Sequence, residues 1–157
     1  MANIPTIGLN DIAARLDAML AAPDTALVAT AQQCADELLA LGEVILEIWL
    51  AARGETPTLH AVEGFRLLAL HRQGARGEPS FNACRETCRE LVYHHNLVCL
   101  EPAHADVARR LRLGAMVARH LQLFIDGKLE VAGLGEFCCS SQPLRQHEAS
   151  AQPAANV

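Results

Sequence analysis

A heptad pattern of apolar residues between Asp24 and Arg53 constrains the fold of this chain more than any other feature. Small and aliphatic side chains recur there in alternating steps of four and three residues: Leu27, Ala31, Cys34, Leu38, Leu41, Ile45, Ile48 and Ala52. This spacing places them on one seam of an α-helix. Thirty residues would form a helix about 45 Å long, which exceeds the width of a small domain. We therefore predict a helix that forms the spine of a bundle or the interface of a homodimer.

The composition supports closely packed helices. Hydrophobic residues make up 51% of the 157 residues but aromatic residues only 4%, so Ala, Leu, Val and Ile supply most of the apolar surface. Such small and aliphatic side chains favour helix-on-helix packing. The balance excludes an intrinsically disordered or collagen-like chain, and also an aromatic-rich surface for single-stranded nucleic acid.

Caps and helix breakers predict four further helices. Prolines and glycines separate them, and we expect them over Ile12–Ala22, Leu59–Gln73, Phe81–Val98 and Ala103–Ile125. The last segment, 140–157, is polar, contains two prolines and has no periodicity. The fold class we predict is an all-α bundle of about five helices. One helical domain would span 1–139, and 140–157 would form a disordered tail.

The charge and the N-terminal sequence indicate a cytoplasmic protein. The formal net charge is −5, which argues against non-specific binding to nucleic acid. The first residues form neither a basic region nor an apolar one, so they do not resemble a signal peptide. The most apolar stretch, Leu38–Ala52, contains Glu43 and Glu47 and is too short to cross a membrane. We therefore expect the six cysteines to be reduced thiols.

Two cysteines give the first chemical lead. Cys84 and Cys88 lie one helical turn apart, on a face that they share with Leu91 and His95. Thiolates at this spacing can hold zinc or an iron–sulfur cluster. His95 lies about 10 Å along the helix from Cys88, too far to bind the same ion. Two ligands would have to come from elsewhere, and the candidates are Cys34, Cys138 and Cys139. The alternative is that Cys84 and Cys88 are small hydrophobic residues of the core.

A second lead lies between Val107 and Leu121. The pattern Val-Ala-x-x-Leu, followed by Val-x-Arg-His-Leu, resembles the helix-turn-helix of winged-helix bacterial regulators. The resemblance implies that Arg119 and His120 approach DNA and that Leu123–Val131 forms the hairpin wing. The competing interpretation is one continuous helix, because apolar residues recur through this region at helical spacing.

The chain contains no motif of the common catalytic sites. A nucleophile elbow, a phosphate-binding loop, a dinucleotide fingerprint and a zinc-protease motif are all absent from the sequence. We therefore predict a small non-enzymatic regulatory or adaptor protein that binds a protein partner or a second copy through the Leu27–Ala52 helix, or a small ligand in its helical bundle. The alternatives are a metal-, iron–sulfur- or redox-sensing protein that uses Cys84 and Cys88, and a winged-helix regulator. No cofactor is expected outside the metal alternative.

Overall fold

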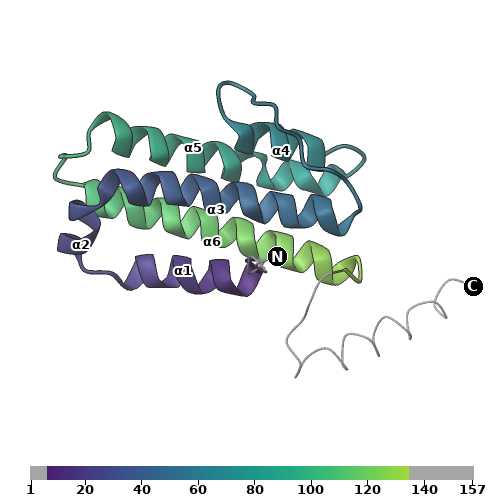
Figure 1. Cartoon of the computed structure of the whole chain (residues 1–157), viewed down its shortest axis with the longest axis horizontal. Helices are drawn as coiled ribbons and strands as arrows, with labels where there is room; N and C mark the ends of the chain where they lie inside the picture. Colours follow the sequence, from purple (N-terminus) through teal and green to yellow (C-terminus); the bar gives the residue numbers. More distant parts are fainter. Residues whose placement is uncertain (1–6, 135–157) are drawn as a thin grey trace, which may run out of the picture.

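The computed structural model describes residues 7–134 and consists of helices (Figure 1). They are α1 (Leu9–Ala21), α2 (Asp24–Ala29), α3 (Ala31–Ala52), α4 (Arg66–Gly74), the 3-10 helix η1 (Pro79–Cys84), α5 (Arg85–Leu100) and α6 (Val107–Val131). No β-strand occurs between residues 7 and 134. The predicted all-α bundle is confirmed, with six α-helices in the described range instead of about five. None of these helices is both long and apolar enough to cross a membrane.

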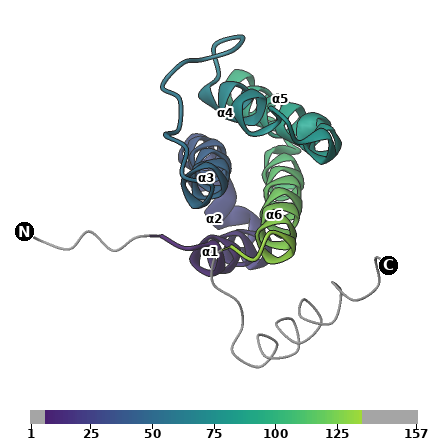
Figure 2. The ribbon, with the colours of Figure 1, turned by 90° about the vertical axis from the view of Figure 1, so that its right-hand side faces the viewer.

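The four longest helices form the bundle. α3 and α6 pack against each other, α5 packs against both, and α1 packs mainly against α6 (Figure 2). α4 lies beside α3 and α5. Viewed end-on, α1 and α5 lie on opposite sides of the α3–α6 pair. The core consists of aliphatic side chains from all of these helices, together with buried Trp49 and Phe81.

The heptad seam is buried within its own chain. Its residues from Leu27 to Ile45 are buried, and so are residues beside the seam such as Ala35, Leu46 and Leu50. α3 is therefore covered over a broad face by α4, α5 and α6. This packing uses the surface that the sequence analysis assigned to a partner or a second copy. The seam from Leu27 to Ile45 is thus covered by the chain itself, whereas Ile48 and Ala52 are partly buried.

The long helix predicted over Asp24–Arg53 is interrupted at Thr30. The Thr30 hydroxyl donates to the carbonyl oxygen of Ala26 at 3.0 Å, and the Thr30 backbone leaves the helical region, with φ −126° and ψ 32°. The carbonyl oxygen of Thr30 then accepts the first hydrogen bond of α3, from the backbone N–H of Cys34 at 2.9 Å. The local hydrogen bonds of a threonine thus separate α2 from α3.

The helix predicted over Leu59–Gln73 begins later, at Arg66. Residues 54–65 form a loop in which Glu63 and Gly64 have positive φ angles of 53° and 83°. The Gln73 side chain holds this loop, because it accepts from the backbone N–H of Thr58 and donates to the carbonyl oxygen of Thr56. The next predicted helix, Phe81–Val98, is divided into η1 and α5, and α5 extends to Leu100.

α6 is one continuous helix, so the helix-turn-helix interpretation is wrong. Residues 107–131 are helical throughout, including Leu123–Val131, which the resemblance assigned to a hairpin. Gly114 does not form a turn. It lies where α6 crosses its neighbours, and a Cβ atom there would be 3.1 Å from Leu38 Cδ1 and 3.5 Å from His94 Cβ. The small residue permits close helix packing.

α3 and α5 also approach closely, at Gly42. A Cβ atom at Gly42 would lie 2.7 Å from Leu91 Cδ2. The absence of a side chain allows Leu91 to pack directly onto the α3 backbone. This contact fixes the distance between the two helices and thereby the position of the polar side chains at their edge.

Candidate functional site

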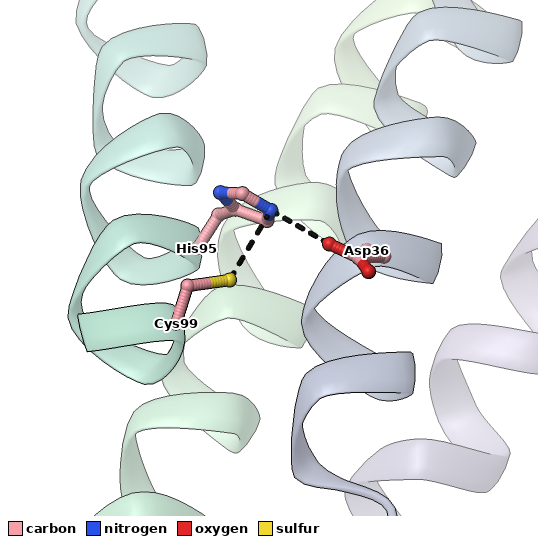
Figure 3. Close-up of side chains that lie close together, drawn as sticks. All are labelled: Asp36, His95 and Cys99. Atoms are coloured by element: carbon pink, nitrogen blue, oxygen red, sulfur yellow. Dashed lines mark hydrogen bonds and ion pairs between the residues drawn. The ribbon is translucent and has the colours of Figure 1, made fainter. Parts of the chain in front are cut away.

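The strongest candidate site lies at the edge of the α3–α5 contact (Figure 3). Asp36 projects from α3, and His95 and Cys99 project from successive turns of α5. His95 Nε2 lies 2.9 Å from Asp36 Oδ1 and 3.5 Å from Cys99 Sγ. One ligand atom from each residue lies within 4.8 Å of the others. Within residues 7–134, this is the one group of three or more such side chains with that geometry.

His95 is held in a defined orientation. Its Nδ1 atom lies 3.2 Å from Asn96 Oδ1, and the edge of its ring meets the Phe65 ring, with the centroids 6.1 Å apart. When Nδ1–H donates to the Asn96 oxygen, the lone pair of Nε2 is directed toward Asp36 and Cys99. This is the tautomer that a metal-binding histidine needs, with a second residue fixing the ring from behind.

The three donor types match a divalent transition metal. Zinc binds thiolate, imidazole and carboxylate at about 2.0–2.3 Å, so neighbouring ligands of a tetrahedral ion lie about 3.5 Å apart. The separations of His95 Nε2 from Asp36 Oδ1 and from Cys99 Sγ, 2.9 Å and 3.5 Å, are close to this value. The Asp36 side chain is 62% exposed and that of His95 14% exposed. The cluster is therefore reached from solvent, and a water molecule can occupy a fourth position.

The Cys99 thiol is protonated more firmly than an ordinary cysteine. Burial of the thiol raises its pKa, and the negative charge of Asp36 adds to the effect. A bound cation reverses this effect, because it neutralises Asp36 and stabilises the thiolate directly. Metal binding at this cluster should therefore release a proton from Cys99.

Cys84 and Cys88, the residues proposed from sequence, lie in a different place. They are 1% and 0% exposed, and they lie on the core face of η1 and α5. The Cys84 thiol donates to the carbonyl oxygen of Phe81 at 3.3 Å, and His71 Nε2 lies 2.8 Å from the same oxygen. In the described residues they have no third ligand that completes a group like the one at Asp36. Their proposed partners Cys138 and Cys139 lie outside the described residues, as does the tail predicted over 140–157.

The two buried thiols shift each other's pKa in opposite directions. A hydrogen bond from Cys88 lowers the pKa of Cys84 to about 6, and His71 contributes in the same direction. The same hydrogen bond, together with burial, raises the pKa of Cys88. Both thiols lie in the core, where reagents in solution do not reach them.

Arg119 and His120 do not form a DNA-binding surface of the predicted kind. Arg119 joins α6 to α1, because its Nε atom lies 3.1 Å from Asp17 Oδ1, and it also contacts Gln122. His120 lines a shallow apolar groove between α5 and α6, with Tyr93, Leu113 and Met116. The two residues lie in the middle of α6, and no turn precedes them.

Sequence reasoning missed the Asp36–His95–Cys99 cluster. Asp36 lies 59 residues before His95, and only the fold brings the two together. The signal that could have drawn attention was the spacing of His95 and Cys99, which places an imidazole and a thiol one turn apart. Comparison with models of protein families, with curated protein sequences and with solved structures found no match to this chain.

Proposed function

We propose that this chain is a small cytoplasmic, non-enzymatic regulatory protein that binds a divalent transition metal, of which zinc is the best match, through Asp36, His95 and Cys99. The observation that carries the proposal is the convergence of a carboxylate, an imidazole and a thiol within 4.8 Å. Metal sensing was one alternative predicted from the sequence, with Cys84 and Cys88 as ligands. The proposal retains metal sensing but assigns different ligands.

The donor set supports zinc and related ions over magnesium or calcium. The latter prefer sites made of oxygen ligands, whereas thiolate and imidazole select zinc, copper, nickel or cobalt. The carboxylate of Asp36, on α3, would balance part of the ion's charge. Three protein ligands leave room for a fourth from water, from a small molecule or from another protein.

The position of the site suggests how metal binding would be sensed. Asp36 belongs to α3, whereas His95 and Cys99 belong to α5, so an ion would link the two helices. A ligand that binds the folded state alone stabilises it in proportion to its affinity and concentration. The proposed role is therefore a regulatory link between the two helices.

Zinc titration by calorimetry of the reduced, metal-free protein tests the proposal. We expect one ion per chain in a background where Cys138 and Cys139 are replaced by serine. Asp36→Asn, His95→Gln and Cys99→Ser should each weaken zinc binding by at least about tenfold, because each removes one ligand. The heat of binding should also depend on the buffer, since a proton leaves Cys99.

His104→Gln is the matched control. His104 Nε2 lies 3.8 Å from Glu101, so it forms a histidine–carboxylate pair without a thiol, and its loss should leave zinc binding unchanged. Circular dichroism of each variant shows whether it is folded. The proposal fails if the variant with serine at positions 138 and 139 binds no zinc. It also fails if the three ligand variants are folded and bind zinc with the same affinity as that parent.

A further inference from the structure

A pocket near the beginning of α5 combines positive charge with a defined shape. Its lining residues come from the 54–65 loop, the end of α4, η1 and the beginning of α5. Its volume is about 280 Å³. The lining residues are Val62, Leu68, His71, Arg72, Ala75, Asn82, Arg85 and Arg89. Three arginines and a histidine line it, and no carboxylate does.

Two of these arginines have no partner. Arg72 and Arg85 form no hydrogen bond or ion pair within residues 7–134, whereas Arg89 contacts both oxygens of Glu63, at 3.2 Å and 3.4 Å. Most other arginines of this part of the chain are paired: Arg15, Arg53, Arg66, Arg110, Arg112 and Arg119. The pocket therefore concentrates unpaired positive charge in a chain whose net charge is −5.

A buried histidine lines the pocket, and a closely packed phenylalanine lies behind it. His71 is buried and its Nε2 atom is fixed by the carbonyl oxygen of Phe81 at 2.8 Å. Behind it, Gly74 allows the Phe81 ring to pack against the α4 backbone, since a Cβ atom there would lie 2.9 Å from Phe81 Cε1. Val62, Leu68 and Ala75 add apolar walls. Apolar walls reduce the screening of charges by water, so each guanidinium attracts an anion more strongly than on an open surface.

We propose that this pocket binds a phosphate group, either as the free ion or as the phosphate of a small monoester. Guanidinium groups present paired N–H donors that match phosphate oxygens, and a doubly charged anion neutralises the two unpaired arginines together. Asn82 supplies an amide at the rim. The volume is just below the range typical of drug-sized ligands, so the ligand is small. The proposal does not depend on the metal site.

Calorimetric titration with inorganic phosphate and, separately, with glycerol 3-phosphate tests it, in a buffer of low ionic strength and with acetate as the reference anion. We expect phosphate compounds to bind the full chain and acetate to bind at least about tenfold more weakly, because charge-assisted hydrogen bonds to a dianion are stronger and more numerous. Tighter binding of inorganic phosphate would identify the free ion as the ligand. Tighter binding of glycerol 3-phosphate would identify a monoester.

Arg72→Gln and Arg85→Gln should each weaken phosphate binding by about tenfold, since each removes one charged donor pair. Arg109→Gln is the matched control, because Arg109 is an exposed arginine on α6 that has no partner within residues 7–134 and does not line the pocket. It should leave the affinity unchanged. The proposal is overturned if neither phosphate compound binds at millimolar concentrations, if acetate binds equally well, or if Arg109→Gln has the same effect as Arg85→Gln. Zinc binding should be unchanged in all three variants, which separates this test from that of the metal site.

Discussion

α5 carries two thiol clusters, and the difference between them indicates what each can do. At the end of the helix, Cys99 joins His95 and Asp36 at an edge that solvent reaches. At its beginning, Cys84, the last residue of η1, and Cys88 form a closed pair on the core face and are at most 1% exposed. The open cluster offers three kinds of donor atom to an ion, whereas the closed pair offers two thiols to the core.

Burial raises the thiol pKa in both clusters, but the neighbouring groups shift the pKa of Cys84 and that of Cys99 in opposite directions. In the closed pair, a hydrogen bond from Cys88 lowers the pKa of Cys84. In the open cluster, Asp36 and burial keep the thiol protonated, and a cation would reverse this. A low pKa alone therefore does not mark the reactive cysteine, since access to solvent is needed as well. The following predictions test this distinction, from the largest expected effect to the smallest.

Phe81→Ala should have the largest effect on stability. Phe81 is 0% exposed and packs on Trp49, His71 and Phe124, with ring centroids 5.4–6.0 Å apart. Its truncation leaves a cavity beside the closed pair and should lower the free energy of unfolding by about 3–5 kcal/mol. Urea unfolding followed by the fluorescence of Trp49, the single tryptophan of the chain, measures this. A loss below about 1 kcal/mol would show that this end of the bundle is not tightly packed.

Alkylation should distinguish the two thiol clusters in the native protein. Cys99 should react with iodoacetamide at least about 100-fold faster than Cys84 or Cys88, because the latter need an opening of the core that costs about 3 kcal/mol or more. The Cys99 rate should continue to rise above pH 9, the ordinary thiol value, since its pKa is raised. Mass spectrometry of peptides gives the rate for each cysteine. Equal rates for Cys84 and Cys99 at neutral pH would instead support redox sensing by the buried pair.

Asn96→Ala should weaken zinc binding without removing a ligand. Asn96 Oδ1 lies 3.2 Å from His95 Nδ1 and fixes the ring. Loss of such a supporting residue typically lowers metal affinity by about 10- to 100-fold. Calorimetry measures the change, and Asn82→Ala is the control because Asn82 lies at the phosphate pocket. If Asn96→Ala binds zinc with the same affinity as the wild type, the orientation of His95 has another cause.

Glu78→Gln should have the smallest effect. A hydrogen bond from Lys128 lowers the pKa of Glu78, and it joins η1 to α6 at 3.0 Å. Because the folded-state pKa is below the ordinary value of 4.5, the contribution to stability is present above pH 4.5 and is lost as the pH falls through the lowered pKa. The stability difference between wild type and Glu78→Gln should therefore disappear in acid. A difference that persists well below that pH would have to come from packing.

The sequence predicts the bundle well where the apolar periodicity is long. α1, α3 and α6 follow from spacing and caps, and the continuity of α6 follows from its apolar stripe. The interruption at Thr30 and the late start of α4 were not predictable from periodicity. The first depends on a side-chain hydrogen bond to Ala26, and the second on a loop held by Gln73 from 15 residues away.

The candidate site was less predictable than the fold. Cys84 and Cys88 attracted attention because they are close in sequence, but their shared face is the core face. Asp36 and His95 are separate polar residues in the sequence, and only the packing of α3 on α5 makes them neighbours. A pattern within one helix shows which side chains share a face, but not whether that face meets solvent or another polar residue.

The absorption spectrum of the cobalt(II)-loaded protein tests the central claim most directly, because a cobalt–thiolate bond gives a charge-transfer band that carboxylates and imidazoles do not give. We expect the band in the wild type and in a variant in which Cys84, Cys88, Cys138 and Cys139 are serine. Cys99→Ser should abolish it. A band that survives in Cys99→Ser but disappears with the four-serine variant would contradict a metal site at Asp36, His95 and Cys99.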